Sequence, residues 1–135
     1  MSSSTAETVR AFYDLFLSGQ VEEIAKRYLT DDFVLTNPLP DPIPFGGRFS
    51  GSAGFLDYVT QVAEAIEIEE FTIDEILTDG ERAVVVGTER SLVRSTGRHY
   101  TMEWVHVVET SKGQIISVRE YNDTAAMQRA FEAAS

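Results

Sequence analysis

The sequence predicts an α+β fold, because helix-like and strand-like patterns occupy different parts of the chain. Up to Ile66, most apolar residues recur at the three- and four-residue spacing of amphipathic helices. After Ile68, the pattern changes to four runs of strand-forming residues separated by short turns that contain glycine. Helices followed by strands are typical of an α+β domain.

Three helices are expected in the first half of the chain. Ser4 and Glu7 fit a capping box that starts the first helix, and Ser18-Gly19 ends it. A short second helix is predicted over Val21 to Leu29. A third amphipathic helix is predicted from Ser52 to Ile66.

The strands are expected mainly in the second half. A short strand over Phe33 to Asn37 precedes a loop, Pro38 to Gly47, that holds all four prolines and forms either a fixed rim over a pocket or a stiff surface connection. Asp123 is the expected N-cap of a last short helix. Tight turns predict an antiparallel meander of the remaining strands, Phe71 to Leu77, Ala83 to Val93, Tyr100 to Val108 and Ile115 to Tyr121.

The acidic composition narrows the range of partners. The chain has 135 residues, a net charge of −11 and no cysteine. Nucleic acid and anionic lipid are themselves negative, so we expect neither as a partner. The lack of cysteine excludes disulfides and thiolate chemistry.

The apolar pattern runs through the whole chain without a linker, repeat or low-complexity block. We therefore expect one domain over residues 1–135. No apolar run approaches the roughly 18 residues that span a bilayer, and Met1 to Thr5 lacks the pattern of a signal peptide. These observations predict a cytoplasmic protein with no membrane partner.

Strand alternation places a histidine near a carboxylate. Glu120 and Asn122 share one face of the last strand. The tight turn at Ser111 to Gly113 brings His106 opposite Glu120 or two residues diagonal to it. A carboxylate can abstract a proton beside a carbonyl while an imidazole positions or protonates the enolate oxygen. The same pair could instead serve only to tie two central strands together.

Motifs for a cofactor, a nucleotide or a metal are missing from the sequence. Gly46-Gly47 and Gly51 to Gly54 lack the spacing of a phosphate-binding loop. Two histidines without cysteine supply no recognisable set of metal ligands, so we expect neither a cofactor nor a metal. Arg90 and Arg94 could each anchor an anion, but pairing with surface carboxylates is favoured.

Several sequence runs, together with the order of elements, carry a family resemblance. They are Asp31-Asp32-Phe33-Val34-Leu35-Thr36-Asn37-Pro38, Phe49-Ser50-Gly51, Gly113-Gln114-Ile115-Ile116 and Arg119-Glu120-Tyr121-Asn122-Asp123. Over nearly its whole length the chain resembles the nuclear transport factor two-like superfamily, most closely its SnoaL-like, ketosteroid isomerase-related branch. The resemblance implies N-terminal helices packed on a strongly curved antiparallel sheet that forms a conical cavity, a cystatin-like α+β barrel.

The resemblance also implies where acid/base residues would lie. SnoaL-like polyketide cyclases use an acid on the last strand with a histidine on the preceding strand, and Glu120 and His106 fall on those positions. This chain departs from the cyclases in having Glu where they have Asp. It departs further from ketosteroid isomerases, because Asn37, Phe12 and Val105 fall where their functional groups lie. Steroid isomerisation by that mechanism is therefore not expected.

Two functions remain open at this stage. The first is an isomerase, cyclase or hydrolase that needs no cofactor and acts on a small apolar or ring-containing molecule with Glu120 and His106. The alternative is a non-catalytic ligand-binding or dimerisation module, with a homodimer formed through the outer sheet face at Val105 and Val107.

In either case, the residues expected to contact the ligand are mostly aromatic. Asn37 could hydrogen-bond the ligand or cap a turn, and Trp104 could form a flat wall of the pocket or fill the core. The full predicted set is Phe12, Phe16, Phe33, Asn37, Phe55, Tyr58, Trp104 and Asn122.

Overall fold

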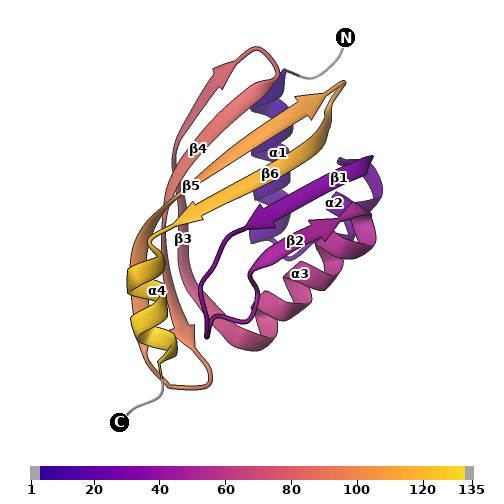
Figure 1. Cartoon of the computed structure of the whole chain (residues 1–135). Helices are drawn as coiled ribbons and strands as arrows, with labels where there is room; N and C mark the ends of the chain where they lie inside the picture. The colour runs from indigo at the N-terminus through magenta and orange to yellow at the C-terminus, as the bar shows by residue number, and fades with distance from the viewer. Residues whose placement is uncertain (1–3, 133–135) are drawn as a thin grey trace.

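The computed structural model describes residues 4–132, in which helices cover one side of a six-stranded sheet (Figure 1). Residues 1–3 and 133–135 lie outside the described range. The segment Met1 to Thr5, in which the sequence shows no signal-peptide pattern, therefore lies partly outside it. The helices are α1 (Thr5–Leu17), α2 (Val21–Arg27), α3 (Gly51–Ala65) and α4 (Thr124–Phe131). The strands are β1 (Leu29–Asn37), β2 (Gly47–Ser50), β3 (Ile66–Asp79), β4 (Arg82–Val93), β5 (His99–Ser111) and β6 (Gln114–Asn122).

Local signals in the sequence set the ends of two helices. The Ser4 side chain accepts a hydrogen bond from the Glu7 backbone N–H and the Glu7 carboxylate accepts one from the Ser4 N–H, so the predicted capping box is confirmed. The Asp123 side chain accepts from the Ala126 N–H, which confirms the cap of α4.

The strand order in the sheet is β2-β1-β6-β5-β4-β3. The predicted meander of β3 to β6 is confirmed, with antiparallel pairing throughout. The wholly antiparallel sheet is a wrong expectation, because β1 runs parallel to β6. After β2 the chain crosses by α3 to the far edge and then returns strand by strand, which brings β6 beside β1 in the same direction.

The sheet is not closed into a barrel, because β2 and β3 form its two edges. The four-residue strand β2, which pairs with β1, begins at the end of the predicted proline-rich loop, where the sequence predicted no strand. Only Phe49 of β2 is buried, so the strand carries almost no apolar pattern.

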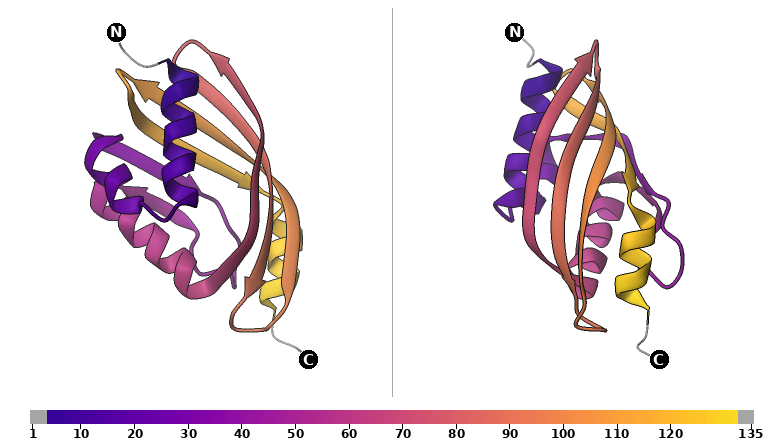
Figure 2. Two further views of the ribbon diagram at one scale, coloured as in Figure 1. Left: turned by 180° about the vertical axis from the view of Figure 1, so that it is seen from behind. Right: turned by 90° about the vertical axis from the view of Figure 1, so that its left-hand side faces the viewer.

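Curvature of the long strands creates the space beneath the helices (Figure 2). Strand β3 has irregular pairing with β4 between Ile68 and Glu70 and again between Ile73 and Glu75, and such bulges bend a strand. Opposite the second bulge lies Gly87, where an added Cβ would overlap the Trp104 ring and the Thr72 carbonyl oxygen. The absence of a side chain at Gly87 therefore lets the indole lie against the strand.

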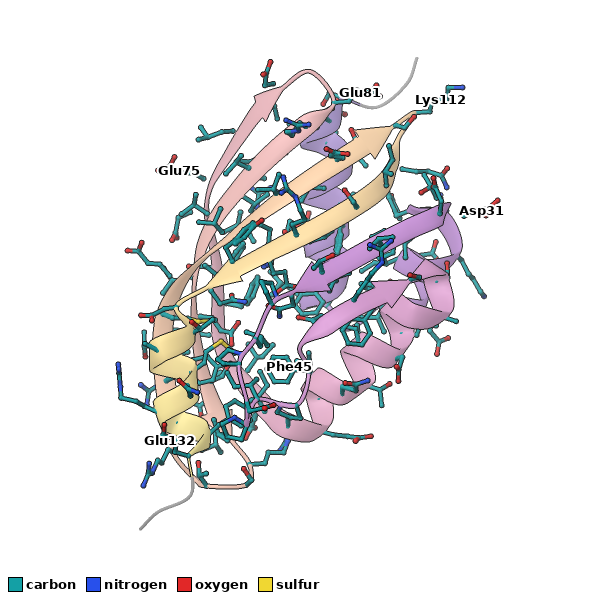
Figure 3. The ribbon with its side chains drawn as sticks, in the orientation of Figure 1. Asp31, Phe45, Glu75, Glu81, Lys112 and Glu132 are labelled. Carbon is teal, nitrogen blue, oxygen red and sulfur yellow. The ribbon has the colours of Figure 1, made fainter. Side chains whose placement is uncertain are left out.

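Charged side chains lie on the surface of the molecule, and apolar side chains point into the core (Figure 3). Asp31, Glu75, Glu81 and Lys112 project outward, whereas Phe45 of the proline-rich loop points inward and is 3% exposed. Within residues 4–132, no helix has the length and apolar character needed to cross a membrane.

Candidate functional site

The site is centred on two side chains of neighbouring strands. His106 of β5 pairs in register with Glu120 of β6, the directly opposite arrangement that strand alternation allows. Their closest approach is 3.2 Å, between His106 Nε2 and Glu120 Oε1. Both residues are buried, at 7% and 9% exposure. An imidazole and a carboxylate therefore interact directly in a space with little water.

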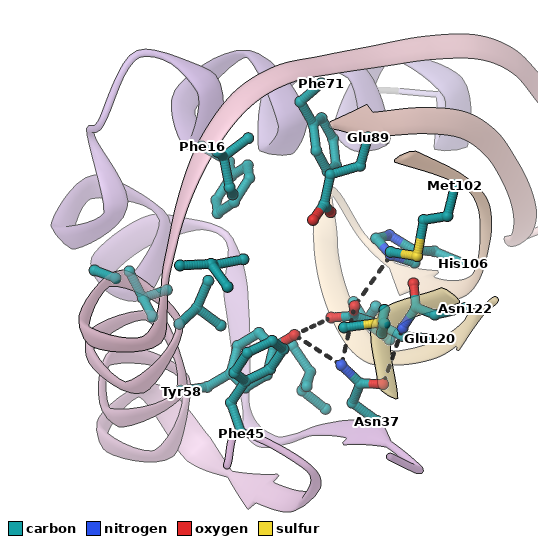
Figure 4. Close-up of a pocket in the computed structure, with 18 of the residues that line it drawn as sticks. Phe16, Asn37, Phe45, Tyr58, Phe71, Glu89, Met102, His106, Glu120 and Asn122 are labelled. Carbon is teal, nitrogen blue, oxygen red and sulfur yellow. Dashed lines mark hydrogen bonds and ion pairs between the residues drawn. The ribbon is translucent and has the colours of Figure 1, made fainter. Parts of the chain in front are cut away.

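Two further groups hold the Glu120 carboxylate (Figure 4). The Tyr58 hydroxyl, from α3, donates to Oε2 at 2.9 Å. The Asn37 amide, from the end of β1, lies 3.4 Å from Oε1 and also donates to the Tyr58 oxygen at 3.0 Å. Asn122 in turn donates to the Asn37 Oδ1 at 3.1 Å. Glu120 is thus oriented by donors from α3 and from the neighbouring strand β1.

Tyr13 of α1 contacts the other side of the imidazole. Its hydroxyl lies 2.6 Å from His106 Nδ1. Burial, and then the negative charge of Glu120, raise the pKa of Tyr13 well above its usual value, so the hydroxyl keeps its proton. A hydroxyl that donates to Nδ1 requires the imidazole hydrogen on Nε2, the nitrogen that lies 3.2 Å from Glu120 Oε1. Tyr13 thereby selects the tautomer that carries its hydrogen on the nitrogen nearer to Glu120.

Tyr58 is also kept as a donor. Burial is the main cause that raises its pKa well above the usual value, and the charge of Glu120 adds to it. The Glu120 carboxylate is therefore surrounded by groups that give hydrogen bonds and do not compete with it for a proton.

A mostly apolar cavity of about 310 Å³ opens onto this network. Six of the eight predicted ligand-contacting residues line it together with Glu120 and His106, namely Phe12, Phe16, Asn37, Phe55, Tyr58 and Asn122. The proline-rich loop contributes Phe45 to the wall, which agrees with its interpretation as a rim. This volume is near the lower end of the range of ligand-pocket volumes in proteins, so the cavity suits a compact molecule.

Phe33 and Trp104 are not among the residues that line the cavity, and both lie in the core behind it. Phe33 is fully buried on β1 and packs edge-on against Phe55. Trp104, 1% exposed, is stacked against Phe71, Tyr13 and His106, so it fills the core behind the imidazole. Of the two alternatives for Trp104, a pocket wall or core filling, the structure agrees with core filling.

The cavity also contains a second buried carboxyl group, Glu89 of β4, which was not predicted from the sequence. Its Oε2 accepts from the Tyr100 hydroxyl at 2.7 Å and from the Ser91 hydroxyl at 2.8 Å. Burial is the main cause that raises the Glu89 pKa, and the charge of Glu120 adds to it. Alternation could have found Glu89, because it shares a strand face with Ala83, Val85 and Val93.

Basic residues lie away from the centre of the site. Arg90 pairs with Glu69 at 3.3 Å, as favoured from the sequence. Arg94 instead donates to the Ala63 carbonyl at 3.0 Å and lines the cavity. No group of three or more His, Asp and Glu side chains within residues 4–132 is arranged to hold a metal ion.

Comparisons with known proteins identify the family. A family model described as "SnoaL-like domain" matches residues 9–118, which leaves Glu120 just beyond the match. An uncharacterised protein from Bacillus subtilis, YesE, is 26% identical over 86 residues. Those residues cover 62% of this chain and 58% of YesE, so the match spans little more than half of that relative.

Solved structures agree in fold over nearly the whole chain. An NTF2-like protein of unknown function from Burkholderia pseudomallei is 30% identical, with a TM-score of 0.82 over 97% of this chain and 99% of that one. TerC, co-crystallised with polyporic acid, is 23% identical, with a TM-score of 0.81 over 95% and 98%. The chain therefore belongs to the SnoaL-like family and has the NTF2-like fold.

Proposed function

We propose that this protein binds a small ring-containing carbonyl compound and transfers a proton at the carbon next to the carbonyl. The observation that carries the proposal is the Glu120–His106 pair, 3.2 Å apart, which lines an apolar cavity. Glu120 acts as the base, and His106 positions it. Cofactor-independent isomerases and cyclases both begin with such a step.

The network suits Glu120 to repeated proton transfer. When Glu120 takes a proton from carbon, the C–H electron pair becomes the enolate double bond and the carbonyl π pair moves onto oxygen. Returning the proton to another carbon would complete an isomerisation, whereas attack of the enolate carbon on a second carbonyl would close a ring. The donors from Tyr58 and Asn37 hold the carboxylate through both outcomes.

The ligand class follows from the cavity wall. The wall of the cavity is mostly apolar, and α1, α3 and the proline-rich loop each contribute aromatic side chains to it. Such a wall favours a ring with few polar substituents. TerC, a relative of the same fold, was crystallised with polyporic acid, which supports a ring-containing ligand for this chain.

The test is turnover of a panel of aromatic polyketide esters by wild type and by Glu120→Gln. Loss of a general base costs roughly 100- to 10,000-fold in rate, so we expect a decrease of that size. Glu103→Gln makes the same chemical change at an exposed position of β5 and should leave the rate unchanged. Equal rates in wild type and Glu120→Gln would remove Glu120 from the mechanism.

Ligand binding without catalysis is the alternative, and the apolar cavity favours it independently of Glu120. Calorimetry with the same compounds separates the two functions. Binding by wild type without turnover of any member of the panel would replace the enzyme proposal with a binding module.

A further inference from the structure

The second buried carboxyl group of the cavity, Glu89, has one oxygen that its neighbours leave free. Both hydrogen bonds that it accepts, from Ser91 and from Tyr100, end on Oε2. Among residues 4–132, no hydrogen bond reaches Oε1. Figure 4 shows the Glu89 carboxyl group pointing into the same space as Glu120 and His106. Oε1 is therefore the atom through which Glu89 can meet a ligand.

Glu89 and Glu120 have different surroundings in the one cavity. Glu120 receives donors on both of its oxygens and has an imidazole beside it. Glu89 receives two hydroxyl donors on one oxygen and is 8% exposed. Environments that separate two carboxyl groups in this way divide them into a base and an acid. Since two donors occupy Oε2, the proton of a neutral Glu89 belongs on Oε1, on the cavity side.

On these grounds, we propose that Glu89 is the general acid of the site and donates its Oε1 proton to the carbonyl oxygen of the ligand while Glu120 removes the proton from carbon. The inference rests on the proposed function and adds a second catalytic residue to it. The C–H electron pair forms the new C=C bond, the carbonyl π pair forms the new O–H bond with the Glu89 proton, and an enol results. In the reverse transfer, the enol O–H returns its proton to Glu89 and carbon receives the proton held by Glu120.

The titratable groups that act on Glu89 come from neighbouring strands, Tyr100 and His106 from β5 and Glu120 from β6. Glu89 in turn acts on Tyr58 of α3, and the charged side chains of Glu67 and Arg94 also line the cavity. Burial, and then the charge of Glu89, raise the pKa of Tyr100, so the Tyr100 hydroxyl stays protonated and remains a donor. The ionised Glu120 favours a neutral Glu89, whereas a protonated His106 would oppose it.

The proposal also limits the ligand. A molecule that uses both groups must present its carbonyl oxygen to β4 and its acidic C–H to β6, with its ring against the aromatic wall. A phenolate imitates the enolate oxygen of such a ligand, so 4-nitrophenol, whose ionisation changes its visible spectrum, is a suitable probe.

The test measures binding of 4-nitrophenol by wild type, Glu89→Gln, Glu89→Met and the surface control Glu103→Gln. Glutamine keeps acceptors for Ser91 and Tyr100 and presents a weaker donor, so affinity should fall about tenfold. Methionine has no donor, so affinity should fall on the order of 100-fold, as on removal of an oxyanion donor. If Glu89→Met fails to fold, Glu89→Gln decides the test alone. Affinity equal to wild type in Glu89→Gln, or no binding by wild type, overturns the proposal.

Turnover by the same proteins separates failure of this inference from failure of the proposed function. If Glu89 is a general acid, kcat/KM of wild type should decrease at high pH, where Glu89 loses its proton. In Glu89→Gln, kcat/KM should be lower at every pH and should lack this decrease. Turnover that needs Glu120 but has the same pH profile in Glu89→Gln overturns the role of Glu89 alone. The opposite result is also possible: Glu89→Gln binds 4-nitrophenol more weakly, but Glu120→Gln turns over substrate at the wild-type rate. That result overturns the proposed function alone.

Discussion

At the scale of single residues, Tyr58 connects the cavity wall to the chemistry. Its hydroxyl donates to Glu120 and accepts from Asn37, so one oxygen joins α3 to β6 and β1. The ring of Tyr58 also packs against Phe45 and Phe49. Replacing Tyr58 by phenylalanine removes the hydroxyl and leaves the ring in place.

Tyr58→Phe should reduce the free energy of unfolding by about 1 to 3 kcal/mol, because a buried carboxylate and a buried amide each lose a partner. Urea denaturation of both proteins measures the difference. Tyr28→Phe is the matched control, since Tyr28 is half-buried and its hydroxyl makes no hydrogen bond to residues 4–132. An equal, small effect in the two variants would contradict a role for Tyr58 in holding Glu120.

Glu89 makes a prediction about pH. Burial raises its pKa in the folded state above the usual value of 4.5, so the folded protein holds a proton that the unfolded chain releases. Stability from this group is fully present below pH 4.5 and is lost as the pH rises through the raised pKa. The free energy of unfolding of wild type should therefore fall relative to that of Glu89→Gln over this range. Urea denaturation at a series of pH values measures it, and a constant difference would refute a raised pKa.

The predictability of the site can be judged residue by residue. Strand alternation and a short turn placed His106 opposite Glu120 or two residues diagonal to it, because both effects are local, and the register of β5 with β6 makes the pair directly opposite. Glu89 carries the same kind of signal, an acid on the inner face of an apolar strand. The contacts of Tyr13 and Tyr58 depend on how two helices rotate and settle on the sheet. No local pattern encodes that packing.

At the scale of elements, β4 depends on one small residue. Gly87 lies between the bulged strand β3 and Trp104 of β5. Trp104 in turn stacks on His106, with ring centroids 4.2 Å apart. A side chain at position 87 would therefore displace the indole that supports the imidazole.

Gly87→Ala should cost about 3 kcal/mol, because its Cβ would overlap both the backbone of β3 and the indole. Gly80→Ala serves as a comparison: Gly80 has a φ of +62° and no neighbour within 4 Å of an added Cβ. Backbone strain alone should cost about 1 kcal/mol there. Thermal or urea unfolding measures both variants, and a cost for Gly87→Ala no larger than for Gly80→Ala would disagree with tight packing of Trp104.

Elements also differ in how well the sequence predicts them. The helices α1 and α4 have capping residues, and β4 to β6 alternate clearly, so their existence and order could be predicted. The parallel pairing of β1 with β6 joins segments about 80 residues apart and has no local signature. β2 forms only because β1 offers it an edge.

At the scale of the whole molecule, apolar residues gather on the face of the sheet turned away from the helices. In the strand register, Leu77 pairs with Val84 and Val84 with Val107, while Val86 pairs with Val105 and Val105 with Tyr121. Leu77 and Tyr121 are 56% and 48% exposed. We propose that a homodimer covers this face, as the sequence indicated.

Sedimentation at micromolar concentration should give the mass of a dimer. Because the chain has a net charge of −11, added salt should strengthen association by screening repulsion. Tyr121→Lys should produce monomers even though it reduces the net negative charge. Leu17→Lys, at the exposed end of α1, is the matched control and should stay dimeric. A monomeric wild type would contradict the dimer.

The central claim is that Glu120 moves a proton next to a carbonyl. The most direct measurement is exchange of the α-hydrogens of cyclic aromatic ketones for deuterium in D2O, followed by proton NMR, because it detects the proton transfer itself whatever product forms. We predict exchange catalysed by wild type and by Glu103→Gln, and a rate roughly 100-fold or more lower with Glu120→Gln. Exchange at the same rate with Glu120→Gln as with wild type would contradict the claim.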